Sequence, residues 1–555
     1  MKKYIEIFLL LIIISTLIIP IISNASSETT TITFKDKNLY NCIVDKLEYV
    51  EKNDSTYSVT ISDINSITDL DLSNSYLQQS KKISDISGLE NFSGLLRLNL
   101  SKNRIINFSP LSNLSSLRDL SIYGNKISNT SDIASLTGLE HLYIGNTGIS
   151  DISFVSNMPN LVDLSIQDNN ITNISSIASL NKLAKLDATR NKITDFSPLS
   201  NLSSLRDLSI YGNKISNTSD IASLTGLEHL YIGNTGISDI SFVSNMPNLI
   251  HLDFQDNNIT EISSISNLKK LASLDTTRNK ITDFSPIKNL SNLRELTIHS
   301  NKISDISDLS KLTELEHLYI GNTGISDISI VKNMPDLINL DAQYNKISNI
   351  ETIANLKDLE TLDLSHNNIE NIEALGDLVY LNKLLINNNK IADINPIYGK
   401  DSIDNLNIEG QVIEVSTNNK SFKLPDLYII VQDSSGVLYS DEGLLTENIE
   451  IDNTTNFATI IDTTKEATIT IKSGLAKNSV LSIKYMNKND NDSNEKKDNK
   501  DIINNNVEDT NINSDKTKSP NKLPYTGKSK IFLIILVLSI FAILLYKKNI
   551  KYKKI

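Results

Sequence analysis

Hydrophobic residues recur along most of the chain with a period of 22 residues. Leucine occupies one position of this period fourteen times in succession: Leu98, Leu120, Leu142, Leu164, Leu186, Leu208, Leu230, Leu252, Leu274, Leu296, Leu318, Leu340, Leu362 and Leu384. A second leucine lies three residues before each of these, and an isoleucine seven residues after each. Self-similarity at a fixed period of this length predicts a repeat protein.

Around each of these leucines, apolar and polar residues alternate, which predicts a short β-strand with its leucine turned inward. One unit cannot bury its inward face alone, so each unit must stack on the next. The pattern therefore predicts a right-handed leucine-rich-repeat solenoid with a continuous parallel β-sheet.

An asparagine follows the strand leucine by five residues in eleven of the units, from Asn103 to Asn389. An inward amide at this place is expected to bond backbone groups of its own and adjacent units, which makes it scaffold. At Thr147, Thr235 and Thr323 the position changes to threonine. A threonine hydroxyl can replace only part of that bonding.

The three threonines lie 88 residues apart, which reveals a cassette of four units. Residues 108–161 are identical to residues 196–249, and a diverged third copy has Ile287 and His299 where the second has Leu199 and Tyr211. Duplication of surface as well as core suits a binding array better than an active site, for which one copy suffices.

The segments on either side of the repeats predict a cap and a second domain. Residues 34–47 have the pattern of an amphipathic helix, with Phe34, Leu39, Ile43 and Leu47 as its buried stripe. The first unit is irregular: Leu70 and Leu72 predict its strand, and Ile83 rejoins the repeat register. Beyond the repeats, residues 411–415, 427–432, 449–451 and 467–471 predict short strands.

The ends of the chain predict export and anchoring. Lys2 and Lys3 precede an apolar run and the small residue Ala25, the pattern of a signal peptide cleaved after Ala25. Near the other end, Leu523, Pro524, Tyr525, Thr526 and Gly527 are followed by an apolar stretch at 531–546 and a lysine-rich tail. The tail is expected to stay in the cytoplasm and to halt export.

The C-terminal arrangement resembles the sorting signal of proteins handled by sortases, whose motif is Leu-Pro-any-Thr-Gly. That resemblance implies cleavage between Thr526 and Gly527 and linkage of Thr526 to peptidoglycan. The repeats, with their helical cap, resemble the internalin family of bacterial surface proteins. The second resemblance implies 3₁₀ or other short helical segments on the convex side and an immunoglobulin-like β-sandwich after the repeats.

The expected organisation has six parts. These are a signal peptide at 1–25, an N-terminal helical cap at 26–66, leucine-rich repeats at 67–401, an Ig-like domain at 402–486, a disordered wall spacer at 487–522 and the sorting signal at 523–555 with its transmembrane segment at 531–546. The net charge of -13 argues against a nucleic-acid binder. Cys42 is the single cysteine, so neither disulfides nor a cysteine-based metal site can hold the fold.

Side chains beside the strand leucines are expected on the concave face. Nine of them are candidate ligand-binding residues: Tyr123, His141, Tyr143, Tyr211, His229, Tyr231, His299, His317 and Tyr319. Strand spacing is expected to put Tyr123 beside Tyr143 and Tyr211 beside Tyr231. Tyrosine with histidine is typical of protein interfaces. A glycan stacking on the tyrosines, or no ligand at these positions, stays open.

Two other readings are excluded by spacing and by motif. The histidines at 141, 229 and 317 would lie roughly 19 Å apart, too far for a shared metal ion. No nucleophile elbow, zinc signature or phosphate loop occurs, so no enzyme activity and no cofactor are expected. The hypothesis is a Gram-positive surface adhesin that binds a host or neighbouring-cell protein. The alternative is an envelope protein that binds the producer's own wall polymers or proteins.

Overall fold

The structure is a computed structural model that describes residues 31–47, 57–60, 64, 66–74, 81–303, 305–397, 400, 402–417, 419–423, 444–452, 457–471 and 479–486. All of them lie in the unit formed by residues 1–488. The predicted signal cleavage site at Ala25, the strand at 427–432, the spacer, the pentapeptide at 523–527 and the apolar segment at 531–546 lie outside the described residues.

The centre of the fold is a parallel sheet of 16 strands, in which each strand pairs with the next along the chain. The strands are β3 (Asp69–Asp71), β4 (Arg97–Asn99), β5 (Asp119–Ser121), β6 (His141–Tyr143), β7 (Asp163–Ser165), β8 (Lys185–Asp187), β9 (Asp207–Ser209), β10 (His229–Tyr231), β11 (His251–Asp253), β12 (Ser273–Asp275), β13 (Glu295–Thr297), β14 (His317–Tyr319), β15 (Asn339–Asp341), β16 (Thr361–Asp363), β17 (Lys383–Leu385) and β18 (Asn405–Asn407). Leucine faces leucine in the register throughout, beginning with Leu70 opposite Leu98. The predicted leucine-rich-repeat solenoid with its long parallel sheet is confirmed.

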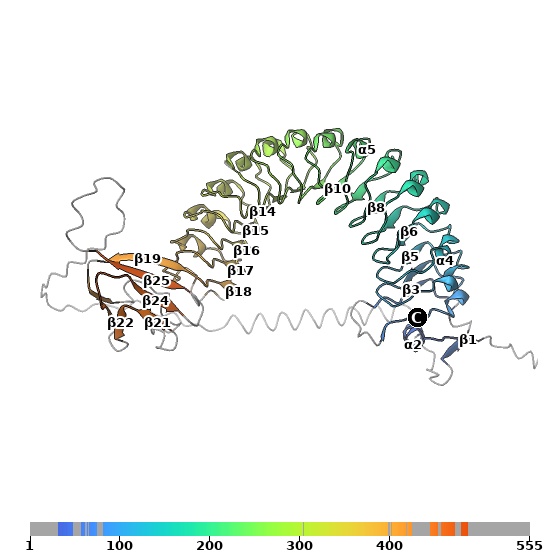
Figure 1. Cartoon of the computed structure of the whole chain (residues 1–555), viewed down its shortest axis with the longest axis horizontal. Helices are drawn as coiled ribbons and strands as arrows, with labels where there is room; N and C mark the ends of the chain where they lie inside the picture. Colours follow the sequence, from blue (N-terminus) through green and yellow to red (C-terminus); the bar gives the residue numbers. More distant parts are fainter. Residues whose placement is uncertain are drawn as a thin grey trace, which may run out of the picture. The chain divides into compact units, whose positions relative to one another are not determined.

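Short helices connect consecutive strands from β3 to β17, and Figure 1 shows them on the outer edge of the repeat array with the strands on its inner edge. They are the 3₁₀ helices η3 (Leu89–Asn91), η4 (Ser109–Leu111), η5 (Ser153–Asn157), η6 (Ser175–Ser179), η7 (Ser197–Leu199), η8 (Ser241–Asn245), η9 (Ser263–Ile265), η10 (Ser285–Asn289), η11 (Ser307–Lys311), η12 (Ser329–Asn333), η13 (Glu351–Asn355) and η14 (Glu373–Leu375), and the α-helical turns α4 (Ser131–Ala134) and α5 (Ser219–Ala222). Neighbouring strands lie closer together than neighbouring helices can, so the array curves with the sheet on its concave side.

The buried asparagines connect consecutive units in the expected way. The Nδ2 of Asn125 donates to the carbonyl of Leu100, 2.9 Å away in the preceding unit, and to that of Ile122 at 3.0 Å. Its Oδ1 accepts from the backbone N–H of Ile105 at 3.0 Å. One side chain therefore bonds three buried backbone groups in two consecutive units.

Threonine replaces only part of this bonding, as predicted. The hydroxyl of Thr147 donates to the carbonyl of Ile144 at 2.8 Å. In units with asparagine, its side-chain oxygen accepts a hydrogen bond from the backbone N–H at the position of Ile127. Here that N–H donates instead to the backbone carbonyl of Thr147, at 3.3 Å. In the same way, the backbone N–H of Ile215 donates to the carbonyl of Thr235, and that of Ile303 to the carbonyl of Thr323.

The N-terminal cap is built from α2 (Lys37–Lys46) and a two-stranded antiparallel sheet of β1 (Thr31–Thr33) and β2 (Ser58–Thr60). The predicted helix was too long at its start, because Asp36 caps it with bonds to the N–H groups of Asn38 and Leu39. Phe34 is buried before the helix begins. The other carboxylate oxygen of Asp36 accepts from the N–H of Ser84 at 2.7 Å, which joins the cap to the first repeat.

The buried side of α2 also differs from its prediction. It consists of Leu39, Tyr40, Ile43 and Val44, whereas Leu47 is only partly buried at the C-cap. Cys42 is also only partly buried against the core. Burial, followed by the negative charges of Asp45 and Asp36, raises the pKa of its thiol, which keeps it protonated and unreactive at neutral pH.

Two small sheets follow the repeats. One has the order β19 (Val412–Thr417), β25 (Val480–Tyr485), β24 (Ala467–Ile471) and β21 (Leu444–Glu447), and the other has β20 (Ser421–Lys423), β23 (Phe457–Ile460) and β22 (Ile449–Asp452). The pair β19 and β25 is parallel, and the remaining pairs are antiparallel. The strands predicted at 449–451 and 467–471 are confirmed, and that predicted at 411–415 begins at 412.

The repeat sheet extends one strand past the boundary expected at 401. Leu406 in β18 pairs with Leu384, and Gln411 occupies the asparagine position of this last unit. Its Nε2 donates to the carbonyls of Ile386 and Ile408, at 2.9 and 3.0 Å. Its backbone N–H bonds the hydroxyl of Ser479 at 2.9 Å, so one residue links the solenoid to the following sheets.

Candidate ligand-binding face

Three rows of side chains run along the concave side of the sheet. The first row is the residue before each strand leucine, the second row the residue after it, and the third row the residue three after it. The strand burial patterns, in which a buried leucine lies between two more exposed neighbours, turn the first two rows away from the core. The parallel register then aligns each row from strand to strand.

The nine predicted residues all lie in these rows and are partly exposed. His141, His229 and His317 belong to the first row, Tyr143, Tyr231 and Tyr319 to the second, and Tyr123, Tyr211 and His299 to the third. They do not form one cluster, because within each row these predicted residues return only at every fourth strand, after roughly 19 Å.

A carboxylate faces His141, His229 and His317 from the preceding strand, whereas the fourth histidine of the first row, His251, faces His229. Asp119 lies opposite His141, with 3.8 Å between Oδ1 and Nε2, and Asp207 lies opposite His229 at 3.7 Å. In the third cassette Glu295 takes this place opposite His317. These carboxylates were not among the predicted site residues, although their recurrence at 88 residues could have revealed them.

The second-row tyrosines are half-buried and have raised pKa values. Burial, followed by the charges of Asp163 and Asp119, raises the pKa of Tyr143 to about 12. Burial and neighbouring carboxylates also raise the pKa of Tyr231 and of Tyr319. The phenols are therefore neutral hydrogen-bonding groups in a negative potential.

The expected pairing of tyrosines on adjacent strands was wrong. Within the described residues Tyr123 and Tyr143 make no ring contact; Tyr123 lies instead over Gly145, where an added Cβ would come within 2.9 Å of its Cδ2. The reason is the register, because Tyr123 belongs to the third row and Tyr143 to the second. The same glycine position recurs as Gly233 beneath Tyr211 and as Gly321 beneath His299.

The first two rows are strongly acidic. They contain three cations, Arg97, Lys185 and Lys383, against eleven carboxylates: Asp69, Asp71, Asp119, Asp163, Asp187, Asp207, Asp253, Asp275, Glu295, Asp341 and Asp363. Two arginines at the ends of the strands are already neutralised, since Arg190 donates to Asp168 and Arg278 to Asp256. The concave face therefore attracts positive charge.

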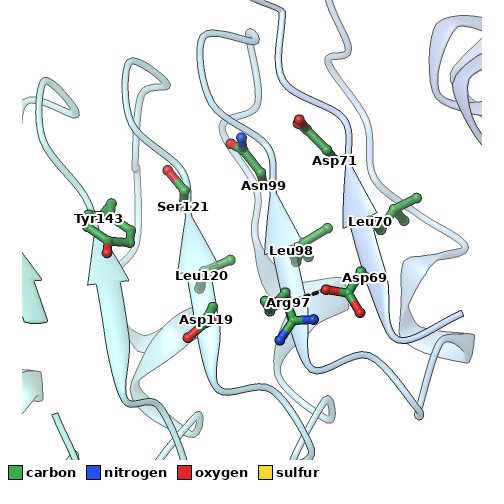
Figure 2. A pocket seen from close by; sticks show the side chains of 10 residues that line it. All are labelled: Asp69, Leu70, Asp71, Arg97, Leu98, Asn99, Asp119, Leu120, Ser121 and Tyr143. Carbon is green, nitrogen blue, oxygen red and sulfur yellow. Dashed lines mark hydrogen bonds and ion pairs between the residues drawn. The ribbon is translucent and has the colours of Figure 1, made fainter. Parts of the chain in front are cut away.

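A hollow of about 300 Å³ opens on this face over β3 to β6. Figure 2 shows the hollow over the strands at Leu70, Leu98 and Leu120, whose side chains are buried beneath the sheet. On its polar edge Arg97 is paired to Asp69, and Asp119 and Tyr143 lie toward the other end. The remaining polar lining comes from Asp71, Asn99 and Ser121. Its shape and mixed lining suit a protruding side chain of a partner better than an enclosed small molecule.

Neither metal nor membrane features occur on the described part of the chain. No group of three or more His, Cys, Asp or Glu residues there could hold a metal ion. No helix within the described ranges is long and apolar enough to cross a membrane.

Comparison with known proteins relates the chain to leucine-rich-repeat proteins. The family described as Leucine Rich repeats (2 copies) matches residues 115–157, 159–201, 203–245, 247–289, 291–333 and 335–377. A search among curated proteins finds no match.

Among solved structures, an internalin, InlF of Listeria monocytogenes, is 32% identical, with 67% of this chain and 95% of that chain covered and a TM-score of 0.45. The functional domain of InlJ from Listeria monocytogenes, which includes a cysteine ladder, is 24% identical over 82% of this chain and 99% of that chain, with a TM-score of 0.59. A leucine-rich-repeat protein of Leptospira interrogans is 24% identical over 64% and 91%, with a TM-score of 0.54. With a single cysteine, this chain cannot form a cysteine ladder. The chain is thus a leucine-rich-repeat protein that is structurally similar to the internalins of Listeria.

Proposed function

We propose that this chain is an internalin-like surface protein of a Gram-positive bacterium that binds a protein on host or neighbouring cells through its concave face. The observation that carries the proposal is the acidic concave face, on which partly exposed tyrosines and histidines recur with each cassette. Such a sheet is long enough for a standard protein interface, and tyrosine is enriched among residues that dominate binding energy. On this view the protein is not an enzyme and needs no cofactor.

The proposal extends to the parts that flank the repeats. Residues 412–486 would form an immunoglobulin-like domain that supports the last repeat through the bond between Gln411 and Ser479. Residues 1–25 would be removed as a signal peptide. A sortase would cleave after Thr526 and join it to peptidoglycan, with residues 487–522 as the spacer through the wall.

The binding proposal is tested with the purified full-length chain and two kinds of surface. The chain is incubated at physiological salt with whole host cells and with stripped walls of the producer, and retained protein is measured. We expect saturable binding to host cells that is lost after protease treatment of those cells. Retention on walls alone would refute the adhesin and support the envelope alternative, and protease-resistant retention on cells would point to a glycan.

The anchoring proposal is tested separately by replacing Thr526 with alanine in the producing cell. A sortase substrate is expected to move from the wall fraction to the membrane fraction, because the scissile residue is lost. The matched control is Thr517→Ala, which changes the same residue type outside the pentapeptide and should leave the protein in the wall. Unchanged wall linkage of the Thr526 variant would contradict anchoring at this motif.

A further inference from the structure

The duplicated segments, residues 108–161 and 196–249, fold in the same way. Phe108 and Phe196, which precede η4 and η7, have backbone angles of φ -106°, ψ 7° and φ -105°, ψ 6°. The helical turns α4 and α5 occur at equivalent places in the two segments. The concave face therefore carries the same surface twice, four strands apart, which is roughly 19 Å.

Each copy contains a carboxylate, a histidine and a tyrosine in fixed register, which we name the cassette subsite. The first consists of Asp119, His141 and Tyr143, and the second of Asp207, His229 and Tyr231. The third cassette has diverged in sequence but keeps the three chemical types as Glu295, His317 and Tyr319. The subsite therefore recurs three times at equal spacing.

The carboxylate of each subsite is available to an external cation. Within the described residues, Asp119, Asp207 and Glu295 form no ion pair with a lysine or an arginine. Asp119 and Asp207 lie 3.8 and 3.7 Å from the histidine of their own subsite, and Glu295 accepts a hydrogen bond from the hydroxyl of Ser273 at 3.1 Å. The adjoining tyrosine is partly exposed, so its ring can also contact a bound cation.

We propose that the three subsites each receive a lysine or arginine side chain of one extended protein partner whose cations are spaced by roughly 19 Å. The inference rests on the proposed function, since it describes the partner of the same concave face. Each contact is weak by itself, because a carboxylate at a surface gains little from one ion pair. Three contacts on one partner reinforce one another, which selects for the spacing of its charges as well as their sign.

Synthetic arginine rods test this spacing directly. A polyproline helix rises about 3.1 Å per residue with three residues per turn, so arginines placed every six residues share one side and lie about 19 Å apart. The matched probe also carries three arginines, but one at every third residue. Its total charge is the same, and its arginines lie on one side about 9 Å apart. We expect the full-length chain to bind the widely spaced rod at least about tenfold more tightly at low salt. Equal binding of both rods, or none of either, overturns the proposal.

Two triple variants separate the subsites from overall charge. Asp119→Asn, Asp207→Asn and Glu295→Gln together are expected to remove the preference for the widely spaced rod. The control, Asp151→Asn, Asp239→Asn and Asp327→Asn, removes equal charge from the convex side. There each Oδ1 accepts from a serine N–H two residues later, a bond that asparagine retains. An equal loss of preference in both variants would show a general charge effect and overturn the subsites.

Folding of the triple variants is checked by their thermal unfolding. Should the concave triple variant unfold, Asp119→Asn alone leaves two subsites and is expected to lower the spacing preference several-fold. A full preference in that single variant would again oppose the proposal. Preference for the widely spaced rod without binding to host cells would support the cassette subsites and contradict the proposed adhesin function. Binding to host cells without a preference between the rods would contradict the subsites and support the adhesin function.

Discussion

The ring of Tyr231 packs against the ring of His251 with 4.6 Å between their centroids. The equivalent Tyr143 instead donates a hydrogen bond from its hydroxyl to Asp163, over 3.0 Å. Both tyrosines belong to the duplicated segments, and their differing partners lie just beyond them, on β11 and β7. The two copies of the duplicated surface therefore have different neighbours on one side.

Replacing Tyr143, Tyr231 and Tyr319 together with serine is expected to abolish binding to the cells that retain the parent protein. The rings are only half-buried, so we expect each change to lower the free energy of unfolding by no more than about 1 kcal/mol. Cell retention and thermal unfolding measure the two effects. Tyr380, which is 61% exposed outside these rows, provides the control Tyr380→Ser with unchanged binding. A folded triple variant with full affinity would contradict a role for the concave tyrosines.

Asn213→Ala is expected to destabilise the solenoid by about 2 to 4 kcal/mol, because it removes the side-chain hydrogen bonds to three buried backbone groups. These are the carbonyls of Ala188 and Ile210 and the N–H of Ile193. Asn213→Thr should cost less, since a threonine hydroxyl can still bond one carbonyl as at Thr235. Urea unfolding measures both variants. Equal stability of the alanine and threonine variants would be inconsistent with the assigned bonds.

Gly233→Ala and Gly236→Ala are expected to separate binding from stability. A Cβ at 233 would come within 2.6 Å of the Cδ2 of Tyr211, so the ring must move and cell binding should fall several-fold. A Cβ at 236 meets nothing within 4 Å, but φ is +79°, so that variant should lose about 1 kcal/mol of stability and keep its binding. Thermal unfolding and cell retention are measured on each. The reverse pattern would show that the ring of Tyr211 does not contribute to the binding surface.

Asp253→Asn is expected to stabilise the fold at neutral pH. Burial raises the pKa of the Asp253 carboxyl to about 6, despite hydrogen bonds from Gln255. Because this value exceeds the ordinary 3.8, the ionised carboxylate opposes folding above pH 6, and its cost disappears as the pH falls from 7 toward 4. Asparagine can keep the bond to the N–H two residues later, as Asn99 does to Ser101.

The expected gain from Asp253→Asn is about 1 to 2 kcal/mol at pH 7.5 and close to zero at pH 4. Urea unfolding of the parent and the variant at the two pH values measures it. A gain of the same size at both values would mean that ionisation of Asp253 is not the cause.

The repeat period was sufficient to predict the fold because each unit contacts mainly its neighbours. An inward leucine, an inward asparagine and the alternation beside them are local properties, and stacking simply copies them. The same logic would have identified the last unit, since Leu406 and Gln411 stand 22 residues after Leu384 and Asn389. Glutamine at the asparagine position concealed it.

The concave rows and their nine aromatic residues also followed from the sequence, because the side to which a residue points depends only on its distance from the strand leucine. Contacts across strands depended on the tertiary structure. Whether Tyr123 meets Tyr143 or Gly145, and whether Tyr231 meets a carboxylate or an imidazole, depends on register and on side chains 20 residues away. Likewise, the raised pKa of Asp253 arises from burial by neighbouring units, and this burial cannot be predicted from the position of Asp253 in its own repeat. The sequence thus encodes the scaffold locally, and only the stacking of the repeat units creates the electrostatic potential and the shape of the concave face.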